Sequence, residues 1–97
     1  MVDMNNYDWL IGISNSEVDG VSLLRFRGTK KEIQQKLSDL VNEDKEKDVE
    51  HWDYGCETVL NIVDNSNGCG WLYQAYGCYS NYHIDYTAID FSHIDEI

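Results

Sequence analysis

The sequence predicts an α+β domain in which a single helix packs on one face of a mostly antiparallel four- or five-stranded sheet, in the chain order ββα-β(β)β. Segments with the two-residue period of strands stand on both sides of one helical segment, and dense clusters of turn residues separate them. Strand hairpins around a lone helix are typical of α+β proteins. The 97 residues contain no repeat and no proline-rich linker, so we expect one globular domain over residues 1–97.

A strand hairpin is expected at the start of the chain. Apolar residues alternate over 7–13 with the period of a half-buried strand, and residues 15–20 supply turn chemistry that ends in Asp-Gly. The second strand is expected over 21–28. Within it Leu24 and Phe26 should lie on one face of the strand, while Arg25 and Arg27 lie on the other.

The helix is expected to begin at a capping box. Thr29 and Glu32 have the spacing at which a threonine hydroxyl and a glutamate carboxylate satisfy backbone donors at a helix start. An apolar stripe follows at Ile33, Leu37, Leu40 and Val41. We expect the helix to end at about Lys47 or Glu50.

Two or three strands are expected in the second half. Residues 58–63 fit either a strand or a short helix, and a turn over 64–68 separates them from a strand that starts at Trp71. After a turn over 77–81, the last strand alternates Tyr82, Ile84, Tyr86 and Ala88 with polar residues. This parity predicts that Tyr82 and Tyr86 pack in the core and that Tyr79, in the turn, is exposed.

The charge distribution is strongly asymmetric. Residues 48–97 hold nine carboxylates and no lysine or arginine, whereas all seven basic residues come earlier, and the net charge is -11. A surface this negative repels nucleic acid and the anionic face of a membrane, so neither is an expected partner. The expected partner is the basic surface of another protein.

A run of acids along the helix is the candidate binding site. Asp39, Glu43, Glu46 and Glu50 recur at spacings that place them on one side of a helix, with neighbours about 5 to 6 Å apart. We extend the candidate site to Asp53, Glu57, Trp52 and Tyr54, because aromatic residues among charges often centre an interface. The hypothesis is a nucleic-acid mimic or inhibitor of the kind that phages and mobile elements encode. The alternative is an ordinary solvated helix face.

Catalytic and cofactor sites are not expected. Cys56, Cys69, Cys78 and His83 lack the close pairing of zinc ligands, so no metal is predicted. Cys78, His83 and Asp85 are the residue types of a nucleophilic site, but the pattern assigns Cys78 to the opposite parity from the other two. The chain is therefore predicted to be a non-enzymatic protein without a cofactor.

The cellular setting and the assembly state are only partly constrained. An odd number of cysteines and the absence of a leader or membrane-span pattern predict a cytoplasmic protein. The sequence leaves open the redox state of the cysteines, the identity of the partner, and whether the chain is a monomer or a homodimer. A second function class is a structural or regulatory domain that self-associates through a strand edge or a tyrosine-rich face.

Overall fold

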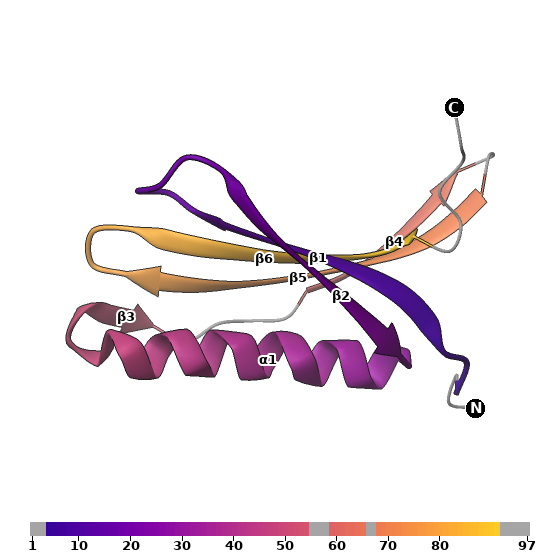
Figure 1. The fold of residues 1–97 in the computed structure, drawn as a ribbon, viewed down its shortest axis with the longest axis horizontal. Coiled ribbons are helices and arrows are strands. Elements are labelled where there is room, and N and C mark those ends of the chain that lie inside the picture. Colours follow the sequence, from indigo (N-terminus) through magenta and orange to yellow (C-terminus); the bar gives the residue numbers. More distant parts are fainter. Residues whose placement is uncertain (1–3, 55–58, 66–67, 92–97) are drawn as a thin grey trace.

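The computed structural model describes residues 4–54, 59–65 and 68–91 and confirms the α+β fold class. Its elements in chain order are β1 (Tyr7–Asn15), β2 (Val21–Gly28), α1 (Lys30–Lys47), the short 3-10 helix η1 (Val49–His51), β3 (Trp52–Tyr54), β4 (Val59–Asn65), β5 (Gly68–Tyr79) and β6 (His83–Asp90). Helix α1 runs along one face of a twisted sheet (Figure 1). All the paired strands are antiparallel.

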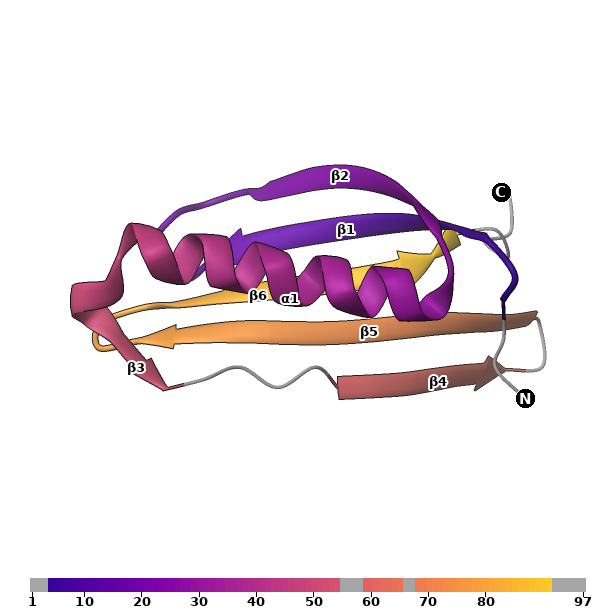
Figure 2. The same ribbon diagram turned by 90° about the horizontal axis from the view of Figure 1, so that it is seen from below.

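The sheet is five strands wide although it contains six strands. Its order is β2-β1-β6-β5-β3, and β4 also pairs with β5. Strands β3 and β4 follow each other along the same edge of β5, as Figure 2 shows. The segment that the sequence left between strand and helix is therefore a strand, β4, and the three-residue strand β3 is an addition that the pattern did not predict.

The core lies between α1 and the face of the sheet turned toward it. Trp9 and Ile11 of β1 are completely buried, as expected from their alternation. The helix contributes Ile33, Leu37 and Val41, which are 0%, 0% and 2% exposed. Burial of each such aliphatic side chain stabilises the fold by about 1.5–3 kcal/mol. The predicted apolar stripe is thus what holds the helix on the sheet.

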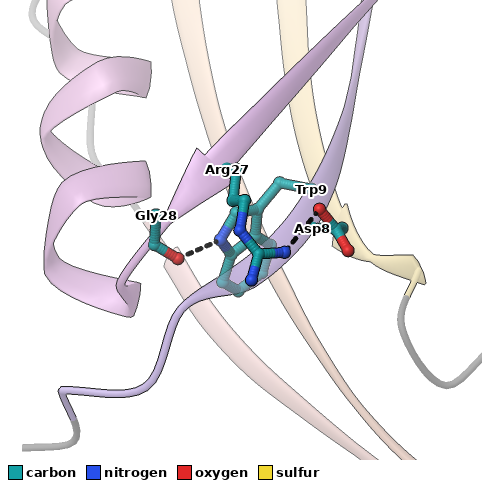
Figure 3. Close-up of polar contacts among 4 residues, drawn as sticks. All are labelled: Asp8, Trp9, Arg27 and Gly28. Atoms are coloured by element: carbon teal, nitrogen blue, oxygen red, sulfur yellow. Dashed lines mark hydrogen bonds and ion pairs between the residues drawn. The ribbon is translucent and has the colours of Figure 1, made fainter.

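The junction between β2 and α1 fixes the start of the helix. The Trp9 indole Nε1 donates a hydrogen bond to the Gly28 carbonyl oxygen at 3.0 Å, and Arg27 Nη1 pairs with Asp8 Oδ1 at 3.0 Å (Figure 3). The predicted capping box is confirmed. The Glu32 amide donates to Thr29 Oγ1 at 3.2 Å, and the Thr29 amide donates to Glu32 Oε1 at 2.8 Å.

The last hairpin turns later than the sequence predicts. Strand β5 continues to Tyr79, whose amide donates to the Tyr82 carbonyl oxygen at 2.9 Å, so Ser80 and Asn81 form a two-residue loop. Tyr79 therefore keeps the inward direction of Tyr73 and is only 5% exposed. The expectation of an exposed Tyr79 in a turn over 77–81 is wrong.

The edge strand β2 is mostly exposed. Leu24 shares the inward face with Phe26, because their register partners are Ile11 and Trp9, but it is 41% exposed. Edge strands have a neighbour on one side only, so inward direction alone does not bury a side chain there. The prediction that Leu24 and Phe26 share a face is confirmed, and Phe26 is half-buried.

Candidate protein-binding surface

The outward side of α1 carries the first three of the predicted acids. Because the stripe from Ile33 to Val41 faces the sheet, residues on the opposite side of the helix point to solvent. Asp39, Glu43 and Glu46 are all exposed. The helix thus presents one apolar side and one acidic side, and the acidic side is not needed to hold the fold together.

The acids continue past the end of the helix. Glu50 is exposed in η1 and Asp53 is exposed in β3. We call the set Asp39, Glu43, Glu46, Glu50 and Asp53 the acidic row. The Gln35 amide donates to Asp39 Oδ1 at 3.0 Å. Over residues 4–54, 59–65 and 68–91, no lysine or arginine forms an ion pair with a member of the row.

The two lysines of the same segment are engaged elsewhere. Lys45 Nζ lies 5.3 Å from the ring centroid of Trp52, a cation–π distance. Lys47 Nζ lies 3.6 Å from Asp44 Oδ1. Both cations are therefore directed toward other groups, and the negative charge of the acidic row is not cancelled locally.

Trp52, one of the two predicted aromatic anchors, is half-buried. Its ring packs edge-on against Tyr79 with centroids 5.2 Å apart, and it covers Gly77, where an added Cβ would lie 3.1 Å from the indole. Part of the indole stays accessible beside the acidic row. Tyr54, the other anchor, ends β3, and Glu57 lies outside the described residues.

Two acids of the helix end turn inward and bind tyrosines. Asp44 accepts a hydrogen bond from the Tyr86 hydroxyl, and Asp48 accepts one from the Tyr82 hydroxyl at 2.5 Å. His51 Nδ1 lies 2.7 Å from the other oxygen of Asp48. These contacts tie the C-terminal end of α1 to β6 and to the turn that precedes it.

The same contacts shift the titration of the groups involved. The hydrogen bond from Tyr82, followed by that from His51, lowers the pKa of Asp48 below its ordinary value. Asp48 in turn raises the pKa of His51 and, with burial as a lesser cause, raises the pKa of Tyr82 to about 12. Burial and the nearby carboxylates raise the pKa of Tyr79. The cluster therefore favours an ionised Asp48 beside a protonated tyrosine.

The tyrosine and carboxylate contacts were not predicted from the sequence, although a signal for one of them exists. Asp44 lies three residues after Val41 and four after Leu40, which places it on the buried stripe and not on the outward side. The contact of Asp48 with Tyr82 joins residues 34 apart and depends on where η1 directs the chain. No local pattern reports such a pairing.

The cysteine, histidine and aspartate of the last hairpin do share one face, so the parity predicted for Cys78 is wrong. Cys78 is the register partner of His83, because the two-residue loop brings these positions opposite each other. His83 Nε2 lies 3.5 Å from Asp85 Oδ2. In the part of the chain that the structure describes, Cys78 forms no hydrogen bond with His83, so the thiol and its candidate base are not coupled.

No group of three or more histidine, cysteine, aspartate or glutamate side chains among the described residues is arranged to hold a metal ion. Over the same residues, no helix combines the length and the apolar character that crossing a membrane requires. No family model, curated protein or solved structure matches this chain.

Proposed function

We propose that this protein is a small, non-enzymatic, protein-binding domain that occupies a basic site on its partner with the acidic row, in the manner of a nucleic-acid backbone. The observation that carries the proposal is that the row is exposed and lacks cationic partners among the described residues, while Lys45 and Lys47 are directed to other groups. A cytoplasmic location, expected from the odd number of cysteines, is part of the same proposal.

Physical chemistry supports this use of the row. Successive acids on one side of a helix stand about 5–6 Å apart, a spacing comparable with that of phosphates along a nucleic-acid strand. Grooves that bind nucleic acid concentrate lysine and arginine, and their affinity comes largely from phosphate neutralisation. An acidic row would be steered to such a groove by the field that attracts the natural ligand.

Release of DNA-bound proteins tests the proposal. Proteins from a lysate of the encoding organism are loaded on DNA-cellulose, and the pure chain is added as a competitor. The wild-type chain should release one or a few basic proteins, and the double variant E43Q/E46Q should release less of them. Raising the ionic strength should also weaken the complex, since exposed charges are screened over about 10 Å at 0.1 M salt.

A matched control separates a binding surface from net charge. Glu17 and Asp19 are exposed in the turn between β1 and β2 and are not members of the row, so E17Q/D19N removes the same number of charges outside it. This control should release proteins as the wild type does. Equal loss of release in the two double variants, or no release by the wild type, contradicts the proposal.

A self-associating domain is the second candidate, and the burial of its tyrosines bears on which surface it could use. The tyrosine-rich face proposed for it includes Tyr73, Tyr79 and Tyr86, which are 1%, 5% and 0% exposed beneath α1. Tyr76 of the same aromatic cluster lies on the side of the sheet turned away from α1 and is half-buried. Self-association would have to use a strand edge or the side of the sheet turned away from α1.

A further inference from the structure

The side of the sheet turned away from α1, which we call the outer face, exposes aliphatic side chains. Leu23 and Val21 of β2 are 64% and 60% exposed, and Ile89 of β6 is 37% exposed. Their register partners on β1 are Gly12, Ser14 and Leu10, so they belong to one side of three adjacent strands. No helix among the described residues covers this side, and α1 lies on the opposite one (Figure 1).

The outer face is electrically balanced in a chain of net charge -11. Its charged side chains on β1, β2 and β6 are the Asp8–Arg27 ion pair, Arg25 and Asp85, whose formal charges cancel. The acidic row, by contrast, repels a second copy of itself. Two copies of this chain can therefore approach each other through the outer face but not through the helix side.

The two unlike charges are arranged symmetrically about Gly12. Arg25 is paired in register with Leu10, two residues before Gly12, on the β2 side of β1. Asp85 is paired with Ser14, two residues after Gly12, on the β6 side. A two-fold axis that runs parallel to the sheet above Gly12, perpendicular to the line from Arg25 to Asp85, places each Arg25 above Asp85 of the partner subunit.

Both charges are accessible for this contact. The Arg25 guanidinium carbon lies 5.5 Å from the ring centroid of Phe91, the residue after β6, so the side chain extends across the outer face and not off the edge of the sheet. The Asp85 side chain is 52% exposed, although His83 Nε2 lies 3.5 Å away. An exposed cation and an exposed anion are thus present at symmetric positions.

The backbone and packing of the isolated chain do not require a glycine at position 12. Its φ is not positive, and an added Cβ would make only ordinary contacts, at 3.6 Å with Val21 and 3.9 Å with Leu23. Glycine inside a strand weakens the strand, and it often marks a position where another backbone approaches closely. Gly12 lies midway between Arg25 and Asp85. The backbone that approaches it can therefore be that of a second copy of this chain, oriented so that the two charges pair.

We infer that the chain forms a two-fold symmetric homodimer through the outer face, with Gly12 on the axis, the exposed Val21, Leu23 and Ile89 around it, and two reciprocal Arg25–Asp85 ion pairs. Such an interface is isologous, since the same patch serves both subunits. The two α1 helices then lie on opposite outer sides of the dimer. This inference does not depend on the proposed function, but a dimer would present two acidic rows that point apart.

Charge exchange in the full chain tests the dimer. Sedimentation equilibrium at tens of micromolar should give twice the chain mass of 11.3 kDa. R25D and D85R should each weaken dimerisation roughly tenfold or more, because each places like charges in contact twice. The double variant R25D/D85R should recover the dimer. The controls K31D and E46R make the same charge changes at exposed positions of α1 and should remain dimeric.

The position of Gly12 on the two-fold axis is tested by adding a large side chain there. G12L should give a folded monomer, with the circular dichroism spectrum of the wild type, because its side chain projects from the outer face. N42L adds the same side chain to an exposed position of α1 and should leave the dimer intact. A monomeric wild type, single charge variants that stay dimeric, a double variant that does not recover, or a dimeric G12L each overturns the inference.

Discussion

At the scale of single residues, the position of the Asp48 carboxylate accounts for most of the unusual chemistry of the chain. One of its oxygens accepts a hydrogen bond from the Tyr82 hydroxyl, and the other contacts His51 Nδ1. Tyr82 also stacks on Tyr79, with ring centroids 4.4 Å apart and planes 5° from parallel. A carboxylate that appeared in the sequence as one more surface acid is thus the point where the helix end, η1 and the last turn meet.

Titration of His51 should make the stability of the fold depend on pH. Asp48 raises the pKa of His51 above 6.5, so the folded state binds the proton more tightly than the unfolded state. The resulting stabilisation is fully present below pH 6.5 and is lost as the pH rises through the folded-state pKa. Asp48 stays ionised across this window because its own pKa is lowered.

The prediction is checked by the free energy of unfolding from urea titrations. The wild type should exceed H51Q by more at about pH 5.5 than at about pH 8.5, on either side of the ordinary histidine range. In D48N the effect of the same histidine substitution should vary less with pH, because only Glu50 then still raises the pKa of His51. An equal difference between wild type and H51Q at both pH values would show that Asp48 and His51 are not coupled in solution.

At the scale of elements, local patterns were sufficient where a few neighbouring residues decide the structure. The capping box at Thr29 and Glu32, the stripe from Ile33 to Val41 and the alternation of β1 each depend on contacts within one element or with one neighbour. They predicted α1 and the first hairpin correctly. The end of β5 was predicted incorrectly because Gly77 suggested a turn. In the structure Gly77 continues β5 and lies against the Trp52 ring.

In the candidate site, too, local patterns predicted some features, whereas others depend on tertiary contacts. Exposure of Asp39, Glu43 and Glu46 follows from helix periodicity alone, so the sequence was enough to place them on the outward side. The contacts of Asp44 and Asp48 with tyrosines, and the pairing of Cys78 with His83, depend on strand register and loop length. Register is set by tertiary pairing across many residues, and the sequence pattern does not report it.

The junction of β2 with α1 predicts a contrast between two glycines. A Cβ on Gly28 would lie 2.8 Å from Phe26 Cε2 and 3.0 Å from Glu32 Oε1, so it would press on a half-buried ring and on the capping box. Overpacking of this kind destabilises a protein by about 1–3 kcal/mol. G28A should therefore lower the free energy of unfolding by about that amount.

Gly12 provides the matched control, since it is also a strand glycine without positive φ and has room for a methyl group. G12A should change the stability of the monomer by no more than about 1 kcal/mol, in the stabilising direction. Both variants are compared by urea unfolding at concentrations where the chain is monomeric. Equal destabilisation by the two substitutions would mean that the contacts around Gly28 are not specific.

At the scale of the whole molecule, charge is separated between the two sides. The helix side carries Asp39, Glu43 and Glu46 of the acidic row, whereas charges on the outer face of β1, β2 and β6 cancel. This separation is costly, because like charges along a helix repel one another. A fold selected for stability and solubility alone would gain by dispersing these acids among the lysines, so their segregation is the feature that connects the fold with the proposed function.

Neutralising two acids of the row should therefore stabilise the fold while it weakens binding. Glu43 stands four residues after Asp39 and three before Glu46, so E43Q/E46Q relieves like-charge contacts. The attraction between Glu43 and Lys47 is a small loss, since Lys47 is directed to Asp44. The free energy of unfolding should rise by roughly 0.5 kcal/mol at low salt. Higher salt should abolish the gain, because screening already removes the repulsion.

The stability measurement is paired with the DNA-cellulose release assay on the same preparations. E43Q/E46Q should be more stable than the wild type in urea and less able to release basic proteins, whereas E17Q/D19N should match the wild type in release. A rise in stability together with a loss of binding shows that the row opposes folding and serves recognition. Loss of stability in E43Q/E46Q would instead mean that these carboxylates stabilise the helix locally, and the case for a segregated binding surface would fail.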